Sequence, residues 1–312
     1  MISLRAHAIS LAAVFLALAI GVALGSGLLS NTVLSGLRDD KQQLAHQIDS
    51  LTEDKNALNQ KLTAAGEFDA QLAPRMVRDA LKDKSVVVFR TPDAADGDVD
   101  AIARIIGQAG GTVSGAVSMT NEFVEANSAD KLLSVVNSPV VPAGKQLNTV
   151  ALDQGSQAGD LLGMALLIDK NPTVPPVDDT QRNTVLTALR DTGFLSYNGH
   201  IGAANTAVIV TGGPLGDDGG NRGTTVARLA AGLAPHGSGV VLVGRDGSAS
   251  GTGPVAVVRS DAGLTGAVST VDDADTSAGQ ITTVLALGEL AAGGRPGQYG
   301  TGRGAASVTL PQ

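Results

Sequence analysis

The residues with the clearest chemical potential are three aspartates, Asp272, Asp273 and Asp275, which stand just before a helical pattern. Carboxylates grouped in this way can bind a hard cation such as Mg²⁺. Carboxylates at the start of a helix can equally cap its free N–H groups and interact favourably with its dipole. The second role is the commoner one, and the sequence does not separate the two.

Ligands for a soft metal are scarce and scattered. The chain has no cysteine, and His7, His46, His200 and His236 stand apart from one another, without an HxxxH or MxxM pair. Copper needs several such ligands close together, so the residues themselves predict no copper site. A GxSxG motif and a recognisable Ser/His/Asp arrangement are also missing. We therefore expect a protein that is not an enzyme and has no resident cofactor.

Two glycine-containing loops, 211–214 (TGGP) and 244–247 (GRDG), directly follow predicted strands. Loops at the carboxyl ends of parallel strands are where α/β folds bind their ligands. Neither loop is a Walker A motif or a GxGxxG that opens a helix. Ordinary tight turns, which a Gly-rich chain needs in number, are the commoner explanation of both loops, and a binding role is the alternative.

The N-terminal stretch from Ala8 to Leu29 decides on which side of a membrane the rest of the chain lies. It holds no charged residue. As a helix it would be about 33 Å long, enough to cross a bilayer core. A secretory signal is the alternative, with Arg5 as its basic region and 23–25 (ALG) as a weak cleavage site. The apolar run is longer than a usual signal core and continues into a helical pattern, which favours an uncleaved anchor. The positive-inside rule keeps Arg5 inside and predicts an exported C-terminal domain.

Heptads follow the apolar segment. One series, at the d positions, is Leu37, Leu44, Leu51 and Leu58, and the other, at the a positions, is Leu34, Lys41, Ile48, Lys55 and Leu62. This spacing predicts a coiled-coil stalk. Gly21 and Gly25 add a GxxxG motif, which lets membrane helices approach closely. Both segments fit a parallel homodimer or a higher oligomer, the alternative being a helix that folds back on its own domain.

Composition and pattern predict an α/β domain beyond the stalk. The net charge is −8, which argues against nucleic acid as a partner. Apolar strands are expected at 85–89, 112–117, 206–210, 239–243 and 255–258, alternating with helices at 99–109, 181–190, 224–234 and 281–290. Such alternation indicates a mostly parallel sheet. The expected organisation is an anchor or signal segment (1–30), a coiled coil (31–65), a joint (66–84), two α/β parts (85–170 and 171–292) and a Gly-rich tail (293–312). The tail is expected to be loose, although 307–310 could add an edge strand.

The chain resembles the actinobacterial copper transporter family over essentially its whole length. The stretches that carry the resemblance include MISLRAHAISLAAVFLALAIGVALGS at the start, EFVEANSADKL from Glu122, LDQGSQAGDLLG from Leu152 and YGTGRGAASVT near the end. The resemblance implies an envelope protein that keeps intracellular copper low, with copper as the transported ion, and a pore-former of the outer membrane. It brings no copper ligands with it.

Two functions follow as expectations. The resemblance implies copper efflux and copper resistance. The heptads and the missing metal ligands instead suggest a non-enzymatic coiled-coil scaffold or regulator of an envelope or cell-wall assembly. Its partners would be a second copy of the chain, the membrane and an envelope protein.

Overall fold

The computed structural model describes residues 4–27, 29–171, 173–216 and 219–310, and the chain divides into two compact units, Met1–Ala65 and Gly66–Gln312. We call the second unit the head. The described helices are α1 (Leu4–Gly27), α2 (Leu29–Met76), α3 (Asp96–Gln108), α4 (Asn121–Val124), α5 (Ala129–Val136), α6 (Gln154–Leu166), α7 (Asp179–Asp191), α8 (Arg222–Leu233), α9 (Pro254–Ser260), α10 (Ala262–Thr265) and α11 (Ser277–Ala291), with short 3₁₀ turns at Ala126–Ser128 and Ala234–His236. The described strands are β1 (Ser85–Arg90), β2 (Thr112–Met119), β3 (Leu195–Tyr197), β4 (Thr206–Val210), β5 (Val240–Val243), β6 (Val268–Val271) and β7 (Gln298–Tyr299).

The N-terminal unit is helical, and α1 contains the predicted apolar segment. Among the described residues, one helix is long and apolar enough to cross a membrane, over Arg5–Ala23. A signal sequence near the N-terminus meets the same criterion of length and composition. The anchor and the signal segment therefore both remain consistent with this helix.

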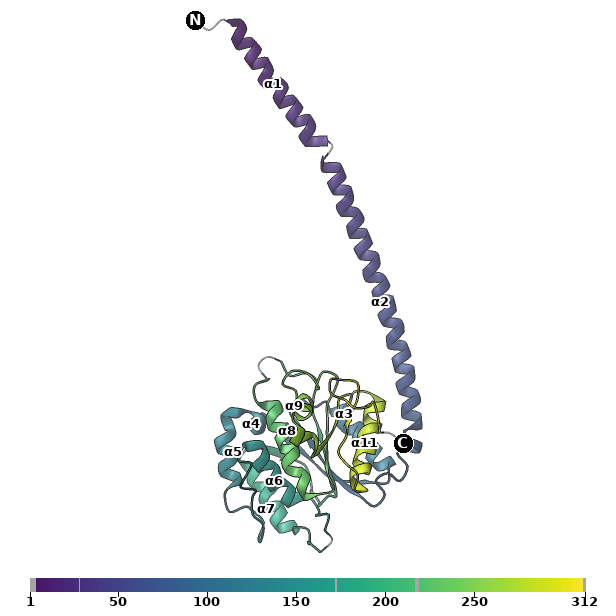
Figure 1. Ribbon diagram of the computed structural model, residues 1–312, viewed down its shortest axis with the longest axis vertical. Helices are drawn as coiled ribbons and strands as arrows, with labels where there is room; N and C mark the ends of the chain where they lie inside the picture. The colour runs from purple at the N-terminus through teal and green to yellow at the C-terminus, as the bar shows by residue number, and fades with distance from the viewer. Residues whose placement is uncertain (1–3, 28, 172, 217–218, 311–312) are drawn as a thin grey trace. The chain divides into compact units, whose positions relative to one another are not determined.

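Helix α2 is continuous through the heptads and beyond them (Figure 1). The predicted joint at 66–84 begins inside this helix, which includes Pro74 and ends at Met76. The proline has no N–H, and its ring clashes with the turn before it, so the helix ends two residues later. Hydrogen-bonded turns then place Val77 and Leu81 in the core of the head, both fully buried.

In the described part of the head, seven strands form one sheet in the order β3-β2-β1-β4-β5-β6-β7. All neighbouring strands are parallel except β3, which pairs antiparallel with β2. The mostly parallel α/β sheet predicted from the alternation of strands and helices is confirmed. Strands from both predicted α/β parts, 85–170 and 171–292, belong to this single sheet.

Helices cover both faces of the sheet (Figure 1). Val87 and Phe89 of β1 face one core, formed with α5, α6, α7 and α8, while Val86 and Val88 face the other core, formed with α3 and α11. Because successive strand residues point to opposite faces, a strand covered on both sides must be apolar throughout. This is why SVVVF in β1 and TAVIV in β4 are continuous apolar runs.

Three expectations in the second half of the head are corrected. The predicted strand at 255–258 is helix α9, which begins with Pro254 at a first-turn position that favours helices. Strand β6 was not predicted, because Ser269 and Thr270 interrupt its apolar pattern although both are buried. The tail after 293 is not loose: β7 pairs with β6, and Tyr299 forms a further bridge to Ser307.

Candidate functional site at the carboxyl edge of the sheet

The direction of winding changes between β1 and β4. The chain runs from β1 outward to β2 on one side, whereas β4, β5 and β6 follow one another on the other side. In open α/β sheets, ligands bind outside the carboxyl ends of the strands at such a switch point. The loop at 211–214, which the sequence offered as one of two candidate loops, leaves β4 at this position.

A cavity of about 160 Å³ lies at the switch point. Its walls come from the ends of β1 and β4 and from three helices, namely Thr91, Pro92, Asp93, Asn121, Val124, Thr211, Leu215, Arg222, Val226 and Pro254. Sequence reasoning found only the 211–214 loop among these segments. The turn after β1 could have been found by the same strand-end rule. Asn121 and Arg222 carry no motif that would have identified them.

Hydrogen bonds hold some of the polar groups that line the cavity in place. The Asp93 carboxylate accepts a hydrogen bond from the Thr91 hydroxyl (2.5 Å) and another from the Gly212 amide (3.1 Å). Arg222 donates through Nη2 to Glu125 (2.9 Å), which is not among the residues that line the cavity. The Thr211 hydroxyl is buried and has no hydrogen-bond partner among the described residues. Residues that carry a carboxylate (Asp93), a guanidinium (Arg222) and an unpaired hydroxyl (Thr211) thus line the same small cavity.

The second candidate loop, 244–247, has a different character. Arg245 donates through Nε to the buried Asp98 carboxylate (2.7 Å), and this hydrogen bond and charge raise the pKa of Arg245. The ion pair connects the loop after β5 to α3. The Arg245 side chain of this loop therefore already has a structural partner.

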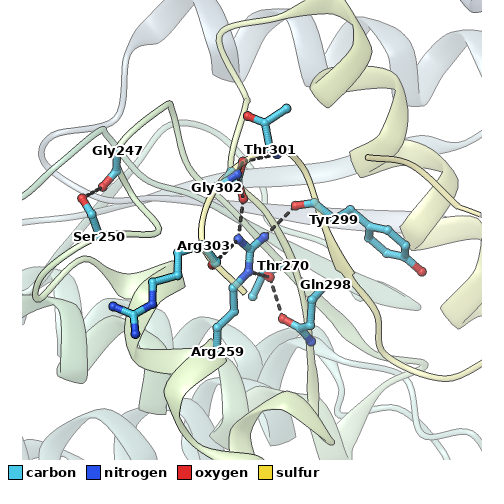
Figure 2. A network of polar contacts seen from close by, with 10 residues as sticks. Gly247, Ser250, Arg259, Thr270, Gln298, Tyr299, Thr301, Gly302 and Arg303 are labelled. Atoms are coloured by element: carbon cyan, nitrogen blue, oxygen red, sulfur yellow. Dashed lines mark hydrogen bonds and ion pairs between the residues drawn. The ribbon is translucent and has the colours of Figure 1, made fainter. Parts of the chain in front are cut away.

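Of the three clustered aspartates, Asp272 forms a buried ion pair with Arg259. The Arg259 guanidinium also donates to the Thr270 hydroxyl (2.9 Å) and to the carbonyls of Tyr299 and Arg303 (Figure 2). The Asp272 carboxylate accepts from the backbone amides of Thr301 (2.8 Å) and Gly302 (3.0 Å). These contacts hold the segment after β7 in place, so the carboxylate of Asp272 has a structural role.

The other two aspartates of the cluster differ from Asp272. Asp273 is buried, and loss of hydration, reinforced by the negative charge of Asp272, raises its pKa to about 6. Asp275 accepts a hydrogen bond from the Asp246 amide (3.2 Å). The cap of α11 comes from Thr276, which accepts from the Gly279 amide (3.0 Å). Within the described ranges, no group of three His, Cys, Asp or Glu residues is arranged to hold a metal ion.

The residues predicted to mediate self-association lie in the N-terminal unit. Leu44, Ile48, Leu51 and Leu58 are each more than half exposed along α2. Around Gly21 and Gly25 in α1, nothing lies within 4 Å of the position that a Cβ atom would take. The side chain of Leu37 lies outside the described residues. Self-association itself stays a prediction.

Taken together, the fold and the site define an α/β protein that joins an N-terminal apolar helix and a long second helix to a doubly wound head. The head carries a small polar cavity at its switch point.

The chain belongs to the family described as copper transport outer membrane protein, MctB, which it matches over residues 1–310. It is 60% identical over 314 residues to the copper transporter MctB of Mycobacterium tuberculosis (strain ATCC 25618 / H37Rv), with all of both chains covered. It is 61% identical over 317 residues to the copper transporter MctB of Mycobacterium leprae (strain TN), again with full coverage of both chains. The family expected from the resemblance is confirmed.

Proposed function

We propose that this protein acts in copper transport in the cell envelope, with copper as the transported ion. The observation that carries the proposal is the identity of 60% over full length to relatives named as copper transporters. Helix α1 supports attachment to a membrane, since it is long and apolar enough to cross one. We extend the proposal to an exported head and, on the family's description, to the outer membrane.

The part of the chain that the structure describes constrains how copper would cross. A single apolar helix encloses no pore, so a pore would need the α1 segments of several copies, or a partner protein. The GxxxG pair, Gly21 and Gly25, would allow close contact between such helices. The head, whose described residues contain no metal-binding group, would then have a supporting, non-enzymatic role.

Deletion of the gene tests copper transport. We expect a deletion strain to grow less well on copper and to accumulate more cell copper, with unchanged tolerance of zinc as the control. The full chain should restore both properties. Unchanged copper tolerance together with unchanged cell copper in the deletion strain would contradict the proposal.

A second candidate function rests on the exposed leucines of α2. Leu44, Leu51 and Leu58 form a stripe that is more than half exposed, which is unusual for ordered leucines unless another surface covers them. We propose as the alternative that the stripe binds an envelope protein and that the chain is a scaffold or regulator. Crosslinking in intact membranes, followed by recovery of the full chain, should then capture an envelope enzyme that the Leu44→Ala/Leu51→Ala variant does not capture. Recovery of the same proteins by both would contradict this role.

A further inference from the structure

The switch-point cavity presents two opposite charges to the same small volume. Asp93, in the turn after β1, and Arg222, the first residue of α8, both line it. The Asp93 carboxylate has two donors, Thr91 and Gly212, which fix its orientation and leave further lone pairs free. A ligand that matches this carboxylate must carry a hydrogen-bond donor, and an ammonium group is the strongest of these.

Arg222 retains most of its donor capacity. A guanidinium has five N–H groups, and among the described residues Arg222 uses one of them, toward Glu125 (2.9 Å). Among the described residues no side chain caps the start of α8, so the backbone N–H groups of its first turn add partial positive charge to that of Arg222. A carboxylate is the group that a planar guanidinium binds best, because two parallel hydrogen bonds can form.

Thr211 provides an independent sign that the cavity takes a ligand. Thr211 lines the cavity and is 1% exposed, and its hydroxyl oxygen is buried without a hydrogen-bond partner among the described residues. A buried hydroxyl that makes no hydrogen bond is costly, and nearly all such groups in folded proteins have a partner. A polar group of a bound ligand would supply it.

The remaining walls set the size and character of the ligand. Val124, Val226 and Pro254 are apolar and buried, so part of the ligand is a short aliphatic group. The volume of about 160 Å³ is well below the roughly 300–1,000 Å³ of pockets that hold drug-sized molecules. A whole nucleotide or peptide would not be enclosed by this space.

We infer that the switch-point cavity binds a small zwitterion of the amino-acid type. The carboxylate of the ligand pairs with Arg222, its ammonium group pairs with Asp93, and the Thr211 hydroxyl bonds to one of the two. The aliphatic part contacts Val124 and Val226. This binding activity is separate from copper transport, and failure of one leaves the other standing.

The test uses the full chain in detergent micelles, with L-alanine as the probe and isothermal titration calorimetry as the measurement. We expect saturable binding with a Kd of about 1 mM or tighter. Propionate lacks the ammonium group and isopropylamine lacks the carboxylate, so each should bind at least about tenfold more weakly, a factor that one lost charged hydrogen bond accounts for. Absence of saturable binding, or propionate binding as tightly as alanine, would overturn the inference.

Two matched pairs of variants connect binding to the named residues. Arg222→Gln should weaken alanine binding at least about tenfold. Arg228→Gln should leave it unchanged, because Arg228 lies on the same helix but pairs with Asp153 (3.4 Å) outside the cavity.

Thr211→Val separates a binding role from a structural one. It removes the unpaired hydroxyl while keeping the shape, so the melting temperature should hold or rise while alanine binding weakens at least about threefold. Thr206→Val is the control, since the Thr206 hydroxyl in β4 is also buried and unpaired but does not line the cavity. Unchanged alanine affinity in both Arg222→Gln and Thr211→Val would overturn the site.

Discussion

In α2 of the N-terminal unit, Leu51 and Leu58 are 67% and 64% exposed, whereas Leu161 and Leu162 in α6 of the head are fully buried. Both pairs sit in regular helices, so helix formation is not what separates them. The head has a sheet to bury its leucines against, and the leucines of α2 have none within their own unit. A regular stripe of exposed leucines is therefore the surface that the predicted self-association would bury.

Polar groups differ between the two regions in the same way. In the head, Arg259 and Asp272 are buried with 3% and 2% of their side chains exposed, and each has several partners. In α2, Lys41 and Lys55 are exposed. The stability of the head depends on satisfied internal contacts, so single substitutions inside it should lower the free energy of unfolding strongly. Substitutions in the N-terminal unit should act mainly on association between chains.

The largest expected effect is on association through the leucine stripe. In a soluble fragment of residues 34–312, the double change Leu44→Ala/Leu51→Ala should dissociate the predicted parallel dimer, because each truncated buried leucine costs about 2–5 kcal/mol. Sedimentation measures the change in mass, and circular dichroism checks that the head remains folded.

The matched control for this change is Gln43→Ala/Ser50→Ala, which alters exposed positions outside the leucine series on the same helix and should leave the mass unchanged. A wild-type fragment that stays monomeric at tens of micromolar, roughly the range where a zipper with a Kd of about 1 μM is associated, would disprove the coiled-coil dimer. The contrast between the two regions would then need another cause.

The next effect concerns the buried ion pair of the head. Asp272→Ala leaves the Arg259 guanidinium buried without its counter-charge and frees the amides of Thr301 and Gly302, so the free energy of unfolding should fall by about 3–5 kcal/mol. Denaturant titration measures it. Asp191→Asn breaks an exposed pair with Arg190 and should cost less than about 1 kcal/mol. Equal losses in the two variants would show that burial does not govern these pairs.

Replacing Asp273 should raise the stability of the protein by an amount that depends on pH. Its pKa is raised from 3.8 to about 6 by burial, so the unfolded chain ionises first and stability falls as pH rises from about 4 to 6. Asp273→Asn removes this loss and should raise the free energy of unfolding by at most about 3 kcal/mol at pH 7.5, with little effect below pH 4. Thermal unfolding at the two pH values measures it, and a gain of the same size at both would contradict the assigned cause.

The smallest effect is expected in α1. Gly21→Ile and Gly25→Ile should weaken association of the membrane segments by an amount on the order of 1 kcal/mol, because a branched side chain keeps two backbones apart. Energy transfer between labelled full-length chains in lipid vesicles measures the association. Ala19→Ile adds similar bulk on another face of the helix and should change nothing. A comparable loss with Ala19→Ile would show that these glycines form no specific interface.

The sequence was most informative where one local signal decided the structure. Continuous β-branched runs identified β1 and β4, and the period of the leucines identified α2. The four apolar residues at 255–258 fit a strand or a helix equally, and only the start at Pro254 and the packing of α9 against the sheet decide for the helix. Local pattern alone cannot resolve a run this short.

The site was less predictable than the fold, because its parts come together only after folding. Asp93 and the Gly212 amide are 119 positions apart, and their hydrogen bond depends on β1 and β4 being neighbours. The tail was misjudged for the same reason. Its glycines look unstructured in sequence, yet the amide of Gly302 is held by Asp272, 30 positions away.

The strand β7 also has a consequence for the timing of folding during synthesis. Arg259 takes two of its carbonyl partners from positions 40 and 44 residues further along the chain. While those residues are still inside the ribosome, the guanidinium has no complete set of acceptors, and the edge strand beside β6 does not exist. The nascent head therefore reaches its final packing late.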